Sequence, residues 1–178
     1  MNTKLQSFIK MVAQKSEESD QPIIISVSGG SCSGKSTFVN QLTASFNDVQ
    51  ILYQDNYQLG SNFALRRESK YKWDDPENFQ LERCASDLKN LIEGKSITVP
   101  IFNLIQNTSA DTQIFQAKKI NIFDGIYASL PPLNTIVSYS LYIEVPYYVR
   151  FFRRIWRFIK HQQSEDLTTP LRYMATFV

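Results

Sequence analysis

The stretch Gly29-Gly30-Ser31-Cys32-Ser33-Gly34-Lys35-Ser36, followed by Thr37, decides the fold class of this sequence. It fits the pattern G-x-x-x-x-G-K-[ST], in which glycines allow a tight turn that brings backbone N–H groups against phosphate oxygens. An apolar, β-branched run at 23–27 precedes it and is typical of a buried parallel strand. A helical pattern follows from about 35 to 46. Strand, loop and helix in this order predict a phosphate-binding loop, the alternative being a glycine turn without a ligand.

The residue types in the loop predict which part of a nucleotide each would hold. The Lys35 ammonium suits the β and γ phosphates, and the Ser36 hydroxyl suits Mg²⁺. The positive end of the helix that opens at Lys35 adds to the attraction for phosphate. We therefore expect ATP or GTP together with Mg²⁺. The residues expected to bind the nucleotide are Gly29, Gly30, Ser31, Cys32, Ser33, Gly34, Lys35, Ser36 and Thr37.

Hydrophobic periodicity outside the loop alternates between strand-like and helix-like segments. Helices are predicted at 4–18, at 76–93 with Gly94 as the stop, and from Pro146 onward. Strands are predicted at 49–53, 119–123 and 141–145, and a hairpin at 97–102 and 112–116. This order predicts an α/β fold, a parallel sheet flanked by helices with a small β-hairpin insertion. We expect one domain over 1–178, with a leading helix at 1–20, the insertion at 97–117, and a basic helix and lid at 146–165.

Composition excludes several classes of protein. The chain has 178 residues, 43% of them hydrophobic, yet no run approaches the roughly 18 apolar residues of a membrane span. The N-terminus lacks the apolar segment of a secretory signal, so we expect a cytoplasmic protein with no membrane partner and with Cys32 and Cys84 reduced. The net charge of +2 argues against a nucleic-acid partner. A homo-oligomer is left open.

Beyond the loop, the sequence resembles the uridine kinase family of nucleoside kinases, within the wider phosphoribulokinase group. The resemblance covers roughly residues 20 to 178 and depends on the order and spacing of several short pieces. After the loop these are Gln54-Asp55-Asn56-Tyr57, Trp73-Asp74-Asp75-Pro76-Glu77-Asn78-Phe79, Glu93-Gly94-Lys95, Val99-Pro100-Ile101-Phe102-Asn103, Ile122-Phe123-Asp124-Gly125-Ile126, and Arg153-Arg154 with Arg157. The resemblance implies transfer of the γ-phosphoryl group of ATP or GTP to the 5′-hydroxyl of uridine or cytidine.

Three aspartates match carboxylates of that family. The resemblance makes Asp55 the catalytic base, and its place after a predicted parallel strand is where such sheets bind ligands. Asp124 ends another predicted strand and is expected to hold Mg²⁺, directly or through water. Asp74 matches the carboxylate that binds the ribose hydroxyls. The alternatives are a turn cap for Asp55, an Asp-Gly turn for Asp124 and a helix cap for Asp74, although Asp75 before Pro76 suits the cap better.

A basic helix and two aromatic residues complete the candidate site. Four arginines share one predicted helical face: Arg150, Arg153, Arg154 and Arg157. Arg154 and Arg157 are the candidates for stabilising charge on the transferred phosphoryl group, the alternative being a solvated basic face. Four apolar residues of the same helix are expected to face the core: Phe152, Ile155, Trp156 and Ile159. Tyr57 and Phe102 are the candidate base-stacking pair, and His161 is expected to be a surface residue.

The sequence also departs from the family pattern. Asn103, Asn107 and Ser109 stand where the family has Asp, His and Arg, and Phe102 replaces a Tyr. Asn107 nevertheless remains, with Asp74, Tyr57 and Phe102, a candidate for substrate binding. The residues at 162–165 are Gln-Gln-Ser-Glu where the family lid has Arg-Gly-Arg-Asp. We therefore expect a small-molecule kinase acting on a nucleoside. The alternatives are a nucleotide-binding homologue with weak or no transfer, acting through a partner, and a P-loop kinase for a sugar or vitamin-like alcohol.

Overall fold

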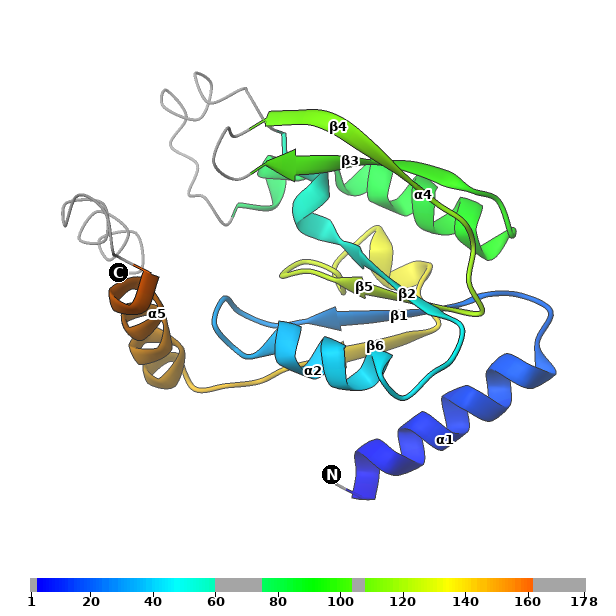
Figure 1. Cartoon of the computed structure of the whole chain (residues 1–178), viewed down its shortest axis with the longest axis horizontal. Helices are drawn as coiled ribbons and strands as arrows, with labels where there is room; N and C mark the ends of the chain where they lie inside the picture. The colour runs from blue at the N-terminus through cyan, green and yellow to red at the C-terminus, as the bar shows by residue number, and fades with distance from the viewer. Residues whose placement is uncertain (1–2, 60–74, 104–107, 162–178) are drawn as a thin grey trace.

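The computed structural model describes residues 3–59, 75–103 and 108–161 and has a parallel sheet at its centre (Figure 1). The strands are β1 (Ile23–Ser28), β2 (Val49–Tyr53), β5 (Ile120–Asp124) and β6 (Tyr139–Tyr142), in the spatial order β2-β5-β1-β6. All three pairs of neighbouring strands are parallel. The predicted α/β fold with a parallel sheet is confirmed.

The two central strands have the sequences that a doubly covered sheet requires. Every residue of β1 and β5 is buried, and β-branched isoleucines dominate both strands. Their register pairs Val27 with Asp124, and Asp124 also pairs with Tyr53 at the end of β2. The carboxyl ends of β1, β2 and β5 therefore meet at one edge of the sheet, where ligands bind in open α/β folds.

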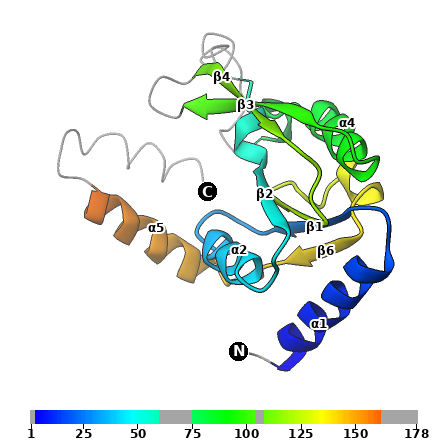
Figure 2. The ribbon, with the colours of Figure 1, turned by 45° about the vertical axis from the view of Figure 1, so that its right-hand side comes forward.

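Helices cover both faces of this sheet (Figures 1 and 2). On one face, α1 (Thr3–Glu18) and α2 (Lys35–Thr43) contribute Val12, Val39 and Leu42 to a core cluster with the odd-numbered isoleucines of β1. On the other face, α4 (Leu81–Ile92) contributes Cys84, Leu88 and Leu91 to a cluster with Ile24, Leu52 and Phe123. No helix among the described residues is long and apolar enough to cross a membrane.

The predicted hairpin is also confirmed, as an antiparallel pair separate from the main sheet. It consists of β3 (Ile97–Asn103) and β4 (Thr108–Phe115). Ile97 and Val99 of β3 are buried in the same cluster as α4, so the hairpin is anchored on the α4 side of the molecule.

Several element boundaries differ from those predicted, and β4 begins at Thr108 rather than at 112. The helix predicted at 76–93 is interrupted: the 3₁₀ turn η2 (Pro76–Asn78) is followed by extended backbone at Phe79 before α4 begins. The interruption is tertiary in origin, because Phe79 forms an isolated bridge with Gln58 and the Gln80 N–H donates to Tyr57 O. The helix predicted over about 35–46 ends at Thr43, and the last strand is β6 at 139–142 rather than 141–145.

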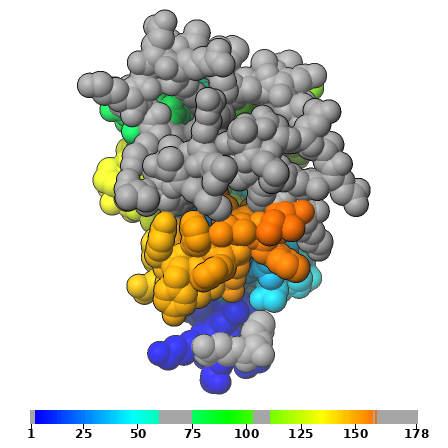
Figure 3. Space-filling model, turned by 90° about the vertical axis from the view of Figure 1, so that its left-hand side faces the viewer, coloured from blue at the N-terminus to red at the C-terminus, as the bar shows by residue number. Residues whose placement is uncertain are grey.

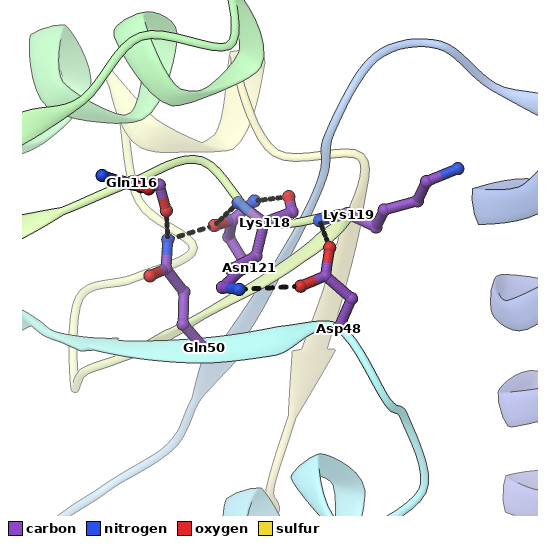
Figure 4. A network of polar contacts seen from close by, with 6 residues as sticks. All are labelled: Asp48, Gln50, Gln116, Lys118, Lys119 and Asn121. Atoms are coloured by element: carbon purple, nitrogen blue, oxygen red, sulfur yellow. Dashed lines mark hydrogen bonds and ion pairs between the residues drawn. The ribbon is translucent and has the colours of Figure 1, made fainter.

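A polar network holds together the amino ends of β2 and β5 (Figure 4). The Asp48 carboxylate accepts from the Lys119 N–H at 2.9 Å and pairs with the Lys118 ammonium at 3.0 Å. Gln50 Nε2 donates to Asn121 Oδ1 at 2.6 Å, and Asn121 is fully buried. This network therefore stabilises the amino ends of the strands. The glycine loop, Asp55 and Asp124 lie at the opposite, carboxyl ends.

Candidate functional site

The glycine loop connects β1 to α2 in a conformation that few residues other than glycine can adopt. Gly29 has φ 148°, and Gly34, the N-cap of α2, has φ 96°. A Cβ atom on Gly29 would lie 2.6 Å from the backbone oxygen of Ile143. The loop is thus packed directly against the chain that follows β6, and its shape is fixed by backbone contacts.

Lys35, the first residue of α2, points back into this loop. Its ammonium donates to Gly29 O at 2.8 Å and to Gly30 O at 3.4 Å. It also interacts electrostatically with the Asp124 carboxylate. The cation predicted to serve the β and γ phosphates therefore lies between the loop backbone and the carboxyl end of β5.

The two predicted carboxylates follow neighbouring strands and have different surroundings. Asp55 lies in the exposed part of the 3₁₀ turn η1 (Gln54–Tyr57), which begins directly after β2. Asp124 ends β5 and is only 7% exposed. Burial raises the pKa of the Asp124 carboxyl above its ordinary value; the Lys35 cation opposes this increase and the Asp55 charge adds to it. The two carboxylates are thus close enough to interact electrostatically, with the lysine near them.

The Asp124 carboxylate has an oxygen atom that is free to bind a cation. Its Oδ1 atom is buried and has no hydrogen-bond partner among the described residues, which is costly unless something binds it. The described part of the chain contains no cluster of three or more His, Cys, Asp or Glu side chains. Mg²⁺ does not require such a cluster, because it commonly binds one or two protein ligands and completes its shell with water and phosphate oxygens. Ser36 and Asp124 therefore fit the metal role predicted for them.

A cavity of about 320 Å³ joins these groups. It is lined by loop residues 31–37, by Asp55 and Asp124, and by Arg154 and Arg157 of α5 (Tyr147–His161). The structure thus gathers around one cavity most of the residues predicted to be catalytic, nucleotide-binding or metal-binding. Five further lining residues were not predicted: Tyr53, Gln58, Phe79, Gly125 and Ile126. The sequence could have indicated Gly125 and Tyr53 as lining residues, because they lie within two positions of Asp124 and Asp55. Phe79 could not be found in this way, because its position depends on the unpredicted extended backbone between η2 and α4.

The basic helix α5 lies beside the loop that joins β1 to α2 (Figure 2), and it is exposed on the face of the molecule shown in Figure 3. Arg153 Nη1 donates to Ser33 O at 3.3 Å and to Cys32 O at 3.5 Å. The Arg150 guanidinium crosses Gly30 so closely that a Cβ atom there would lie 1.8 Å from Nη1. Arg150 and Arg153 therefore contact the loop backbone, while Arg154 and Arg157 line the cavity.

Two predictions about aromatic and apolar residues need correction. Phe152, Trp156 and Ile159 do not face the core, since each is more than 60% exposed, whereas Ile155 of the same set is half-buried. Arginines of α5, and not these three apolar residues, contact the loop. Tyr57 is fully buried and donates its hydroxyl to Asp87 Oδ2 at 2.8 Å, so it offers no surface on which a base could stack.

Of the remaining substrate-binding candidates, only Phe102 lies among the described residues, and it does not line this cavity. Phe102 is half-buried in β3, and its N–H donates to Asn56 Oδ1 at 3.3 Å. Asp74, Asn107 and the lid residues at 162–165 lie outside the described residues. Their predicted roles stay predictions.

Comparison with known proteins places this geometry in a family. The sequence matches the phosphoribulokinase / uridine kinase family over residues 24–165. It is 33% identical over 147 residues to a uridine kinase of Clostridium novyi (strain NT), covering 80% of this chain and 71% of the relative. It is 30% identical over 167 residues to a uridine kinase of Shewanella amazonensis, covering 89% and 79%.

Solved structures show the same fold. A protein described as a fructose transport system kinase of Silicibacter sp. TM1040 superposes with a TM-score of 0.72 at 20% identity, covering 88% of this chain and 84% of that one. A protein described as a possible uridine kinase of Bacillus stearothermophilus superposes with a TM-score of 0.61 at 16% identity, covering 87% and 89%. With its phosphate loop, its two carboxylates at the sheet edge and these relatives, the chain belongs to the phosphoribulokinase/uridine kinase family of P-loop small-molecule kinases.

Proposed function

We propose that this protein transfers the γ-phosphoryl group of ATP or GTP to the 5′-hydroxyl of a pyrimidine nucleoside, uridine or cytidine. One observation carries the proposal: the phosphate loop, Lys35, Asp55 and Asp124 all border a single cavity. A phosphate cradle, a cation, a proton acceptor and a metal-binding carboxylate are the components that phosphoryl transfer to an alcohol needs.

The roles follow from where the side chains lie. The loop backbone and Lys35 hold the triphosphate. Ser36 and Asp124 would hold Mg²⁺, which would supply positive charge to neutralise the phosphate oxygens. Asp55, on the exposed turn after β2, accepts the proton of the attacking hydroxyl. Arg154 and Arg157 approach the cavity from the α5 side and stabilise negative charge on the transferred group.

The choice of a nucleoside as acceptor is supported by the relatives named uridine kinase and by the resemblance that assigns the ribose hydroxyls to Asp74. The experiment that tests the whole proposal measures ATP and GTP turnover over a panel of nucleosides and small alcohols, with and without Mg²⁺. We expect turnover that requires Mg²⁺ and is fastest with uridine or cytidine. Turnover that favours a sugar or another small alcohol would replace the nucleoside.

The lysine of the loop gives a direct test of nucleotide binding. Lys35→Ala removes a charged hydrogen-bond donor to the phosphates, which is worth about 1.5–3 kcal/mol, so ATP affinity should fall by roughly one to two powers of ten in calorimetry. Lys89→Ala, at an exposed position of α4, serves as the matched control and should bind as the parent does. Parent-like affinity in Lys35→Ala would exclude the phosphate-loop assignment.

A second candidate function is nucleotide binding with little or no transfer, exerted through a partner. The observation in its favour is the sequence Gln162-Gln163-Ser164-Glu165 where the family lid carries two arginines, since a transition-state arginine is worth about 10³ or more in kcat. The same panel separates the two: tight ATP binding without turnover on any acceptor would favour this second function.

A further inference from the structure

Gln54 lies between the turn that carries Asp55 and the turn that follows Asp124, and it takes no part in the proposed reaction. It is the first residue of η1, directly before Asp55, and its side chain is fully buried. It does not line the cavity. Its side chain instead extends from the end of β2 to the chain that follows β5.

Two contacts connect Gln54 to that chain. Gln54 Oε1 accepts the Tyr127 N–H at 2.9 Å. The side chain also lies flat against Gly125, where an added Cβ atom would be 2.0 Å from Oε1 and 2.4 Å from the Gln54 Cβ. Gly125 in turn donates its N–H to Val27 O at 3.1 Å. One side chain thus fixes the backbone on both sides of residue 126, immediately after Asp124.

The contact therefore lies between the immediate neighbours of the two carboxylates: Gln54 precedes Asp55, and Gly125 follows Asp124. The same turn carries the Tyr127 ring, which packs edge-on against Phe79 at 5.7 Å, and Phe79 lines the cavity. We infer that Gln54 is a positioning residue that sets the separation and orientation of Asp55 and Asp124. The inference rests on the proposed function for its catalytic consequence.

The Gln54 amide lowers the free energy of unfolding relative to an apolar side chain of the same size. Gln54 Nε2 is buried and has no hydrogen-bond partner among the described residues, and an unsatisfied buried donor costs about 1–3 kcal/mol. A methionine of similar length and shape would fill the same space without that donor. The amide at this position is therefore better explained by the hydrogen bond that it accepts from the Tyr127 N–H, beside the site, than by packing in the core.

The chain offers a matched control in the same strand pair. Gln50 also reaches from β2 to β5, donating to Asn121 Oδ1 and to Gln116 O at 2.8 Å, but at the amino ends of the strands (Figure 4). Gln50→Met removes a comparable bridge at the opposite edge of the sheet. A purely structural role for Gln54 predicts that Gln54→Met and Gln50→Met affect the protein in the same way.

The experiment compares Gln54→Met, Gln50→Met and Gly125→Ala with the parent. Since a displacement of about 1 Å at a reacting group can cost 10²-fold in rate, we expect Gln54→Met to lower kcat by roughly tenfold to a hundredfold. The melting temperature should stay close to the parent value. Gly125→Ala should reproduce the kcat loss, because its Cβ atom displaces the Gln54 side chain, whereas Gln50→Met should leave kcat within about twofold.

Two further measurements do not depend on turnover. The Tyr127 amide should exchange its hydrogen faster in Gln54→Met than in the parent, and the gain in ATP affinity on adding Mg²⁺ should be smaller in calorimetry. A parent with no turnover would refute the proposed function, and these two measurements would then decide the role of Gln54. Parent-like exchange and Mg²⁺ dependence would overturn the inference, as would equal kcat losses in Gln54→Met and Gln50→Met.

Discussion

At the scale of single residues, the buried surroundings of Asp124 disfavour the charged form of its carboxyl. Burial raises the pKa of its carboxyl above the ordinary value of 3.8, although the Lys35 cation counteracts part of the increase. Between the ordinary and the raised value, the folded state binds more protons than the unfolded chain. The free energy of unfolding contributed by this group therefore falls as pH rises through that window.

Asp124→Asn should consequently stabilise the protein while damaging its function. Without Mg²⁺ at pH 7, we expect the variant to melt at a higher temperature than the parent, because the amide removes a buried charge. The difference should shrink as pH falls through the raised pKa of the parent Asp124 carboxyl, because that carboxyl then becomes protonated. Adding Mg²⁺ and ATP should raise the melting temperature of the parent more than that of the variant. A variant less stable than the parent at pH 7 would mean that the Lys35 attraction outweighs the cost of burial.

Asp55 stands in a more open place and allows the chemical step to be separated from binding. Asp55→Asn keeps the size of the side chain but removes the proton acceptor, so transfer should fall by about 10²–10⁴. ATP affinity should stay nearly unchanged, because the loop and Lys35 hold the phosphates. Single-turnover kinetics combined with calorimetry checks both expectations. Transfer at the parent rate would make Asp55 a structural residue and require another base.

At the scale of elements, two adjacent glycines of the loop should tolerate substitution very differently. A Cβ atom on Gly29 meets the backbone of Ile143, and its φ of 148° is strained for other residues. Gly29→Ala should therefore lower the free energy of unfolding by about 1–3 kcal/mol. A Cβ atom on Gly30 meets only the flexible guanidinium of Arg150, which can move aside, so Gly30→Ala should cost less. Urea unfolding of both variants checks this, and equal costs would show that Arg150 is held rigidly against the loop.

The elements also show how far the sequence alone could lead. The bounds of β2 were predicted to the residue, and those of β1, β3 and β5 to within one residue, because short β-branched runs and turn residues carry local signals. The strand β4 begins four residues earlier than predicted. The interruption of the predicted helix at Phe79 had no local signal in the sequence. It depends on the bridge between Phe79 and Gln58, two residues that are far apart along the chain. The orientation of α5 could not be predicted either. Periodicity separates its arginine face from its apolar face, but which of them meets the protein depends on the carbonyl groups of Cys32 and Ser33.

In the candidate site, too, residues that belong to local motifs could be predicted from the sequence, whereas residues placed by long-range contacts could not. Motif residues such as Lys35 and Asp124 were identified because their chemistry is local to a strand end or a loop. Tyr57 was assigned wrongly, because its burial depends on Asp87, thirty positions along the chain and on another helix. The sequence predicts no role for Gln54, since its partners Gly125 and Tyr127 are brought to it only by strand pairing.

At the scale of the whole molecule, the two edges of the sheet carry different tasks. At the amino ends of β2 and β5, polar groups pair with one another in a network around Asp48 and Asn121 (Figure 4). At the carboxyl ends, Asp124 keeps a buried oxygen without a partner among the described residues. Satisfied bonds at one edge hold the strands in register, and this leaves the groups at the other edge available to a ligand.

The acceptor is the property on which the sequence differs most from its family, and it depends on the molecule as a whole. A pocket that discriminates among bases needs polar groups that the wrong base would leave unpaired. Asn107 and Ser109 replace the histidine and arginine of the family pattern. Tyr57 is fully buried in the structure, so it is not available to stack on a base. We therefore expect modest affinity for uridine and weak discrimination between pyrimidine and purine nucleosides.

The measurement is kcat/KM for uridine, cytidine, adenosine and guanosine, repeated with Asn107→His and Asp74→Ala. Asn107→His restores a polar group of the family pattern and should widen the preference for pyrimidines. Asp74→Ala removes the carboxylate expected to bind the ribose hydroxyls, so it should lower kcat/KM for all four nucleosides by a similar factor. A parent that already prefers uridine over purines by several orders of magnitude would contradict the expectation, because base selection would then come from groups other than those altered here. An Asp74→Ala variant with parent-like kcat/KM would show that the ribose is bound elsewhere, and the acceptor would have to be sought among other alcohols.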